Sequence, residues 1–409
     1  MLQPAQSVFM IGWEYPPHNS GGLGVACEGL TQALAGANTE VFFTLPYGYP
    51  GQVSHMHVLD CSDPSWATTS PHQPPFSAYA QVTPPNQPRK ITASQLTALP
   101  QSEMEHRVEQ YAKLVQKQAQ QLKREFNVIH AHDWMSLPAA AQVKAKTGRP
   151  LIAHVHSTEH DRIPHGQGSP YILHAEQEGL KLADKIIAVS YYTKRVLVDK
   201  YGLNEAKIEV VHNGFSTLET TPDPGPHHFA TQRPVVVFMG RLTMQKGGEY
   251  FLKIAEQVLQ KLPDTLFIVA GYGDMYHELL FKAAYQKLSA SLLFSGFVRD
   301  HQREKLLDRA DVFVMPSVSE PFGLVALEAA QRHTPVIISK QSGVAEVLRS
   351  ALAIDFWDVS KMSAAVIELL QNQGFAHTQV TTQLQELRQV TWQNAAVQVK
   401  DIYRKAFLG

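Results

Sequence analysis

Short apolar runs recur along the whole chain, and each ends in glycine or in polar residues. They lie at 8–12, 41–45, 128–134, 151–159, 185–190 and 208–214, and again at 235–240, 266–270, 292–296, 312–316, 336–339 and 352–354. Helical patterns at 25–34, 103–124, 250–259 and 391–407 lie between or after them. Because continuous apolar runs are typical of parallel strands covered on both faces, the pattern predicts an α/β protein of doubly wound, Rossmann-like sheets.

The chain is long enough for two such units. With 409 residues and 44% hydrophobic content it can bury two cores, since domains commonly have roughly 100–200 residues. A stretch rich in Pro, Asp, Gly and His follows Asn213 and is typical of an interdomain linker. Residues 46–100 show no sustained period, and we expect ordered loops with short strands there. We predict a first domain at 1–213, a linker at 214–233, a second domain at 234–390 and a last helix at 391–409.

Composition excludes several classes of protein. The net charge is −1, so bulk charge gives no footprint for nucleic acid and no strong membrane signal. Cys27 and Cys61 are the only cysteines, which neither build a disulfide framework nor fit a metal spacing. The N-terminus lacks the charged and apolar segments of a signal peptide, and no apolar run approaches a membrane span. We therefore expect a soluble protein of the reducing cytoplasm.

Two glutamates bracket an apolar run that follows the strand at 312–316. A helix begun by Pro321 would point the N–H groups of Gly323 and Leu324 at the strand end, where they could bind an anion. Glu328 would lie about 12 Å beyond Glu320 along that helix. Two such acids could hold the ends of an extended ligand with a negative middle, the shape of a nucleotide diphosphate sugar. Standing alone, the pair is more often a solvated helix face.

Other loops also favour a phosphate ligand. Arg241 and Lys246 lie on a strand-to-helix loop that contains no acid, which indicates an anion site rather than surface decoration. Gly21 and Gly22 follow the first strand, where bare backbone N–H groups can approach a phosphate, although such glycines can also serve tight turn geometry alone.

These motifs together resemble a known family. The E-x7-E spacing from Glu320 to Glu328 is similar to that of retaining glycosyltransferases with the GT-B fold, the family 4 and glycogen/starch synthase group. G-R-L-x-x-x-K-G at 240–247 and H-A-H-D-W at 130–134 also match this group. So does W-E-Y-P-P…G-G-L-G at 13–24, except that Asn19 stands where bacterial synthases carry lysine. The resemblance implies two Rossmann-like domains that face each other across a cleft, with the last helix crossing back to the first domain.

The resemblance also implies roles for the matching residues. The first glutamate of the motif holds the donor sugar, the second holds the ribose, and the Arg and Lys hold the diphosphate. The expected catalytic residues are His156, Asp133, Arg241, Lys246 and Glu320. The expected donor-binding residues are Gly21, Gly22, Arg241, Lys246, Val298, Glu320, Phe322, Gly323, Leu324 and Glu328.

The sequence thus predicts a retaining glycosyltransferase, similar to glycogen synthase, that moves a hexose from a UDP- or ADP-linked donor to a carbohydrate or small-molecule acceptor. A nucleotide-sugar epimerase of the same fold and a non-catalytic binding member are the alternatives. No D-x-D pair is present, so neither a metal at the diphosphate nor a further cofactor is expected. His154 and His156 form an H-x-H pair that would suit zinc, but that pair lacks a third ligand.

Overall fold

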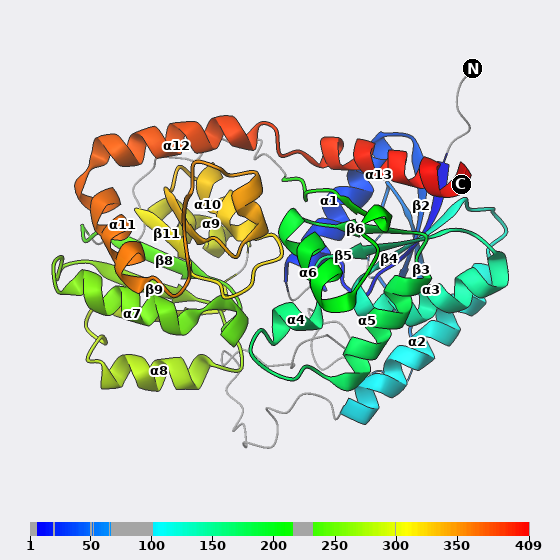
Figure 1. The fold of residues 1–409 in the computed structure, drawn as a ribbon, viewed down its shortest axis with the longest axis horizontal. Coiled ribbons are helices and arrows are strands. Elements are labelled where there is room, and N and C mark those ends of the chain that lie inside the picture. The colour runs from blue at the N-terminus through cyan, green and yellow to red at the C-terminus, as the bar shows by residue number, and fades with distance from the viewer. Residues whose placement is uncertain are drawn as a thin grey trace.

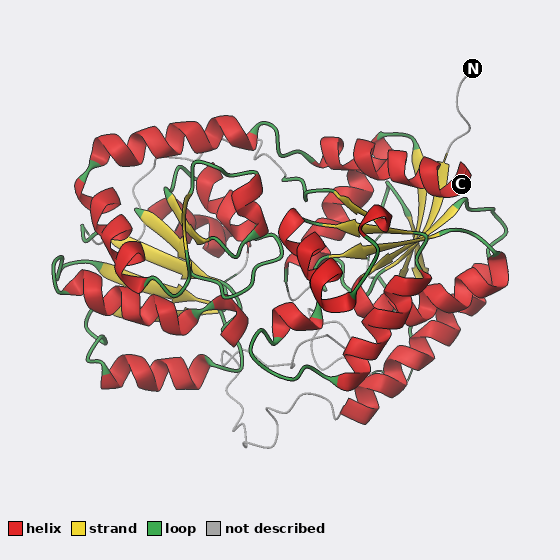
Figure 2. Cartoon of the chain, viewed as in Figure 1, coloured by secondary structure: helices red, strands yellow, loops and turns green. Residues whose placement is uncertain are grey.

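The computed structural model describes residues 6–18, 21–49, 51, 53–64, 66, 101–215, 232–298 and 300–408. Asn19, most of the expected loop region beyond residue 66, and residues 216–231 of the expected linker lie outside these ranges. The described chain forms two α/β units side by side, each a sheet between layers of helices (Figures 1 and 2). The predicted fold class is therefore confirmed.

The first unit is built on a parallel sheet of seven described strands in the order β3-β2-β1-β4-β5-β6-β7. The strands are β1 (Gln6–Ile11), β2 (Thr39–Leu45), β3 (His57–Asp60), β4 (Val128–His132), β5 (Leu151–Val155), β6 (Lys185–Ala188) and β7 (Ile208–Val210). The helices are α1 (Gly22–Gly36), α2 (Gln101–Gln121), α3 (Asp133–Thr147), α4 (Glu159–Arg162), α5 (Pro170–Leu182) and α6 (Tyr191–Tyr201). Within the expected loop region, β3 is one of the short strands.

The central strands β1, β2, β4, β5 and β6 are buried on both faces, as their continuous apolar runs predict, whereas the edge strands β3 and β7 are partly exposed. Phe9 and Ile11 of β1 belong to a core shared with α2, α3 and α5, whereas Val8 and Met10 pack toward α1 and the last helix, α13 (Trp392–Leu408). This alternation follows from the two-residue period of a strand. The sheet is therefore sandwiched between two layers of helices, and its loops at the strand ends remain for function.

The second unit repeats this arrangement with six described parallel strands in the order β10-β9-β8-β11-β12-β13. The strands are β8 (Val235–Met239), β9 (Leu266–Ala270), β10 (Leu292–Gly296), β11 (Val312–Met315), β12 (Val336–Ser339) and β13 (Leu352–Ile354). The helices are α7 (Gly248–Leu259), α8 (Tyr276–Tyr285), α9 (Asp300–Arg309), α10 (Leu324–Gln331), α11 (Val359–Gln371) and α12 (Gln373–Leu387). One core lies under α7, α8 and α11, and the other under α9, α10 and α12.

The chain passes between the units at two adjacent points. Phe215 forms a parallel bridge with Thr391, so the outgoing and returning segments lie side by side. Beyond that point α13 packs on α1, where a Cβ at Gly29 would lie 2.2 Å from the Trp392 indole. The terminal helix therefore completes the first unit, at the upper right of Figure 1, although it follows the second in sequence.

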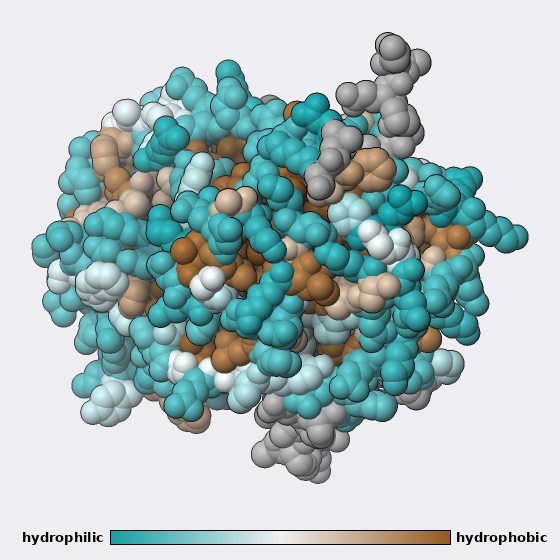
Figure 3. All heavy atoms as spheres, turned by 45° about the vertical axis from the view of Figure 1, so that its right-hand side comes forward, coloured by the Kyte–Doolittle hydropathy of each residue, from teal (hydrophilic) through white to brown (hydrophobic). Residues whose placement is uncertain are grey.

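Most of the visible face in Figure 3 is hydrophilic, and hydrophobic residues appear there only as separate patches. Among the described helices, none is both long and apolar enough to cross a membrane.

Candidate active site

Glu320 lies at the carboxyl end of β11, where ligands bind in open parallel sheets. It forms a parallel bridge with Ser342 and is only 5% exposed. Its Oε2 accepts hydrogen bonds from Lys246 Nζ at 2.7 Å and from Ser317 Oγ at 3.2 Å. A carboxylate this deeply buried needs such partners. Glu320 is thus held rigidly, with a cation beside it.

The prediction that a helix begins at Pro321 is wrong. Gly323 has φ +106°, a left-handed conformation that favours glycine, and α10 begins only at Leu324. Glu320 therefore precedes the helix, and the two glutamates are not spaced along one helix axis. The backbone N–H groups of Gly323 and Leu324 still lie at the start of α10, where an anion could bind as expected. Phe322 points into the core with 3% exposure, so any contact of Phe322 with a donor would use its backbone.

Glu328 lies within α10 and faces α9. Its Oε1 is 3.1 Å from Arg303 Nη1, and its side chain is 19% exposed. Burial raises the pKa of Glu328, while the charges of Arg303 and Arg332 act against that rise. The carboxylate thus has a cationic partner within the protein, and its expected contact with a ribose remains a prediction.

Arg241 follows β8, and Lys246 ends the short 3-10 turn at Met244–Lys246. The expectation that no acid lies near them holds for the loop sequence but not in space, because Glu320 pairs with Lys246. A Cβ built on Gly21 would lie 3.4 Å from Arg241 Nη2, and one built on Gly22 would lie 3.6 Å from Leu324 Cδ1. The glycine loop of the first unit therefore faces both the cation and the start of α10.

Asp133 and His156 meet at the neighbouring ends of β4 and β5. Asp133 Oδ1 accepts the backbone N–H groups of His156 at 2.7 Å and Ser157 at 3.2 Å. Burial raises the pKa of Asp133 to about 7 despite these bonds and the charge of Arg162. Burial lowers the pKa of His156 to about 3, so its imidazole is neutral at ordinary pH. The structure therefore brings these two residues together, and both lie on the first unit.

Val298 follows β10 and packs partly buried on the core under α9, α10 and α12. It lies in the loop that the family resemblance assigns to the base. Its assignment remains a prediction, as do the roles of the other site residues.

Polar contacts between the two units escaped the sequence analysis. Ser319 Oγ donates to Asp161 Oδ1 at 2.6 Å, and Ser190 Oγ donates to the Pro321 carbonyl at 2.6 Å. Glu346 accepts the N–H groups of Tyr191 and Tyr192 at the start of α6 and bonds the His212 ring at 2.7 Å. Each of these contacts joins residues that are far apart in the sequence, so local pattern could not identify the pairs.

A histidine cluster lies behind Asp133 and His156. Ligand nitrogens of His130, His132 and His154 all fall within 4.8 Å of one another, and the three residues are buried. His130 and His132 form a second H-x-H pair that the sequence analysis did not combine with His154. The in-register pairing of β4 with β5, which sets His132 against His154, is what joins them.

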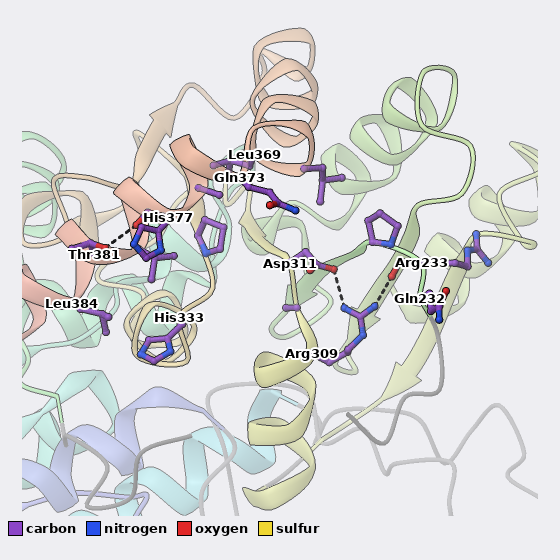
Figure 4. Close-up of a pocket in the computed structure, with 16 residues that line it drawn as sticks. Gln232, Arg233, Arg309, Asp311, His333, Leu369, Gln373, His377, Thr381 and Leu384 are labelled. Atoms are coloured by element: carbon purple, nitrogen blue, oxygen red, sulfur yellow. Dashed lines mark hydrogen bonds and ion pairs between the residues drawn. The ribbon is translucent and has the colours of Figure 1, made fainter. Parts of the chain in front are cut away.

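A cavity in the described structure lies away from these residues. A hollow of about 600 Å³ opens where β8, β11 and β12 begin, next to Pro234, Asp311 and Pro335. Arg309 spans it, donating to Asp311 at 2.8 Å and to the Arg233 carbonyl (Figure 4). Because parallel sheets bind ligands at the carboxyl ends of their strands, we take the residues around Glu320 as the candidate active site.

Two facing α/β sheets with functional groups at the strand ends define the GT-B class of architecture. The solved sucrose-phosphate synthase from Thermosynechococcus elongatus superposes with a TM-score of 0.76 at 20% identity, covering 98% of this chain and 99% of that one. Anabaena HepE in complex with UDP-glucose gives a TM-score of 0.70 at 16% identity, covering 98% and 99%. These likenesses establish the fold.

Sequence comparison gives the family. The family model for glycosyltransferase family 4 matches residues 20–217, and that for glycosyl transferases group 1 matches residues 220–386. An uncharacterized glycosyltransferase of Methanocaldococcus jannaschii is 28% identical over 98% of both chains. A glycogen synthase of Mycobacterium tuberculosis is 27% identical, covering 98% of this chain and 95% of that one. The chain belongs to this group of GT-B glycosyltransferases, as its motifs predicted.

Proposed function

We propose that the protein is a retaining hexosyltransferase that moves a hexose from a UDP- or ADP-linked donor to an acceptor hydroxyl. Glucose is the hexose that we propose. One observation carries the proposal. Lys246, Glu320 and the start of α10 meet at one strand end, and Arg241 there faces the Gly21 loop of the other unit. Cations and free N–H groups are thus gathered at the place where a diphosphate would leave.

Each group has a proposed task in the transfer. Arg241, Lys246 and the N–H groups of α10 stabilise the charge that develops on the leaving diphosphate, where preorganised donors act most strongly. Glu320 orients the donor sugar, with His156 and Asp133 on the opposite side. Glu328 contacts the ribose, and Val298 lines the base. Because leaving group and incoming hydroxyl share one sugar face in a retaining transfer, the protein supplies charge stabilisation and orientation. No cofactor or diphosphate-bound metal is part of the proposal.

Named relatives support the substrate class. Solved neighbours include HepE complexes with UDP and UDP-glucose and a trehalose-6-phosphate protein bound to UDP-2-fluoro glucose. Relatives named as glycogen synthase and α-maltose-1-phosphate synthase favour a carbohydrate acceptor. We also propose a cytoplasmic location. Nucleotide sugars are found there, and its reducing conditions keep thiols such as those of the buried Cys27 and Cys61 reduced.

A matrix of UDP-, ADP- and GDP-sugars against glucan, glucose 1-phosphate and monosaccharide acceptors tests the proposal. We expect one donor and acceptor pair to give product, and NMR of the new linkage to show the donor's anomeric configuration. Inverted product would refute the retaining transfer. Donor isomerised without acceptor would identify an epimerase instead. Tight donor binding with no turnover against any acceptor would favour a non-catalytic member.

A further inference from the structure

An ion pair joins α9 to α10 near the proposed donor site. Arg303 Nη1 on α9 lies 3.1 Å from Glu328 Oε1 on α10. The two helices are neighbours in Figure 1 and bury residues in the same core. Because helical side chains lean toward the N-terminus of their helix, the Glu328 carboxylate is displaced from its own Cα toward the start of α10. That is the end of the helix where the donor diphosphate is proposed to bind.

The ion pair uses one oxygen of the Glu328 carboxylate. Among the described residues, Arg303 is the only cation within ion-pair distance of this carboxylate, and it contacts Oε1. The Glu328 side chain still keeps 19% exposure. Because both oxygens of a carboxylate accept hydrogen bonds, Oε2 remains available for a donor from a ligand, such as a ribose hydroxyl.

The second arginine near Glu328 is engaged by other acids. Arg332 directly follows α10, and its Nη1 donates to both carboxylate oxygens of Asp308 at 3.0 Å. Its Nη2 lies 3.2 Å from Glu304 Oε2. Both of these acids are on α9. Arg332 thus holds the two helices together, and Arg303 is the arginine that acts on the Glu328 carboxylate directly.

The charge state of Glu328 depends on these neighbours. Burial raises the pKa of Glu328, the charges of Arg303 and Arg332 oppose that rise, and the negative charge of Glu304 adds to it. The exposed His301 lies 3.7 Å from Glu304 and offsets that negative charge only when it is protonated. Loss of Arg303 therefore moves the pKa of Glu328 further up, so the carboxylate takes up a proton at a higher pH.

Building on the proposed function, we propose that Arg303 is a positioning residue for the nucleotide donor. It holds Glu328 by one oxygen and keeps the carboxylate ionised, and the other oxygen accepts a hydrogen bond from the ribose. Arg303 itself does not contact the nucleotide, and its whole effect passes through Glu328. Hydrogen bonds to ionised groups are about twice as strong as neutral ones. Nucleotide binding therefore weakens when Glu328 is neutral, even if the ribose contact is kept.

Calorimetric titration with UDP and with ADP tests this role without an acceptor. With the nucleotide that binds wild type, Arg303→Gln should bind within about twofold of wild type at about pH 8 and about tenfold more weakly at about pH 6, where its Glu328 is largely protonated. Phosphate protonation occurs in the same pH range, but it affects every variant equally. Arg303→Lys keeps the charge and should retain the wild-type pH profile. Arg388→Gln, an exposed arginine at the end of α12, is the matched control.

A double-mutant cycle separates this role from direct contact. Arg303→Gln/Glu328→Gln should bind the nucleotide within about twofold of Glu328→Gln alone at every pH. Additive losses would overturn the proposal, because Arg303 would then act on the nucleotide or on the fold. Wild-type affinity in Arg303→Gln across the pH range would also overturn it. If neither nucleotide binds wild type, or if Glu328→Gln binds normally, the proposed ribose contact fails and the role of Arg303 fails with it. Should Arg303→Gln not fold, Arg303→Met, which keeps an aliphatic stem, takes its place in the cycle.

Discussion

Replacing Lys246 by methionine removes one charge from the proposed diphosphate site. It also leaves the buried Glu320 carboxylate without its cationic partner. The two side chains are 2.7 Å apart, with exposures of 26% for lysine and 7% for glutamate. At an effective dielectric constant of 20 their gross attraction is roughly 6 kcal/mol. Removing one partner of a buried pair costs about 3–5 kcal/mol, and the partly exposed lysine places this pair at about 3 kcal/mol. A domain of this size should then melt about 6–12 °C lower.

Lys246→Met should also slow the reaction, for a separate reason. One cation about 4 Å from a departing phosphate contributes roughly 4 kcal/mol at the same dielectric. Water entering the vacated space recovers part of that energy. A residual loss of about 2.7 kcal/mol corresponds to a kcat about 100-fold lower. Initial rates at saturating donor measure this loss, and calorimetry measures the stability.

A double variant separates the two effects. Adding Glu320→Gln removes the stranded charge while Ser317 still bonds the amide, so Lys246→Met/Glu320→Gln should recover most of the lost stability. Activity should stay low, because the diphosphate still lacks its cation and the sugar lacks its carboxylate. The reasoning fails if Lys246→Met keeps kcat within threefold of wild type, or if the double variant regains activity together with stability.

Three further outcomes are expected. Glu328→Gln should raise the donor KM more than it lowers kcat, because the ribose changes little in the transition state; an unchanged KM in initial-rate assays would contradict the ribose contact. Omitting Mg²⁺ should leave turnover unchanged, and a strict Mg²⁺ requirement would count against the two-cation site. Burial alone would raise the pKa of Glu346, but bonds from His212 and two backbone N–H groups lower it below 4.5. Its stabilising effect is therefore full above that pH and lost as pH falls through the lower folded value, a slope that urea titrations of Glu346→Gln should lack.

Local pattern was sufficient for the sheets. Strands β9, β10, β12 and β13 have the bounds that their apolar runs predict. The central strands β9 and β12 are buried on both faces, which explains their continuous runs. The start of α10 was not predictable in the same way. Pro321 is a common first residue of a helix, but the left-handed Gly323 delays α10 by three residues, and the backbone conformation of a glycine is set by its surroundings.

Contacts between distant segments were beyond the sequence for a different reason. Arg241 and Lys246 were predicted to form an anion site from their own loop, yet Glu320, which pairs with Lys246, lies 74 residues beyond it. Likewise, each H-x-H pair is visible alone, but their convergence depends on the register between β4 and β5. One residue of slip would send His154 to the opposite face. Sequence motifs therefore identify candidate residues, but the register between neighbouring strands determines which of these residues are in contact.

The placement of Glu320 depends on both halves of the molecule. Its neighbour Ser319 donates to Asp161 and its neighbour Pro321 accepts from Ser190, so residues on both sides of the glutamate are bonded to the first unit. Interfaces made of a few polar bonds generally permit relative domain motion. When such bonds break, Glu320 loses the supports that flank it; when they form, it is fixed beside Lys246. A donor that contacts Arg241 and the Gly21 loop together would favour the joined state, and by linkage the joined state would bind that donor more tightly. Under the proposed function, the two units would thus couple donor binding to the assembly of the site.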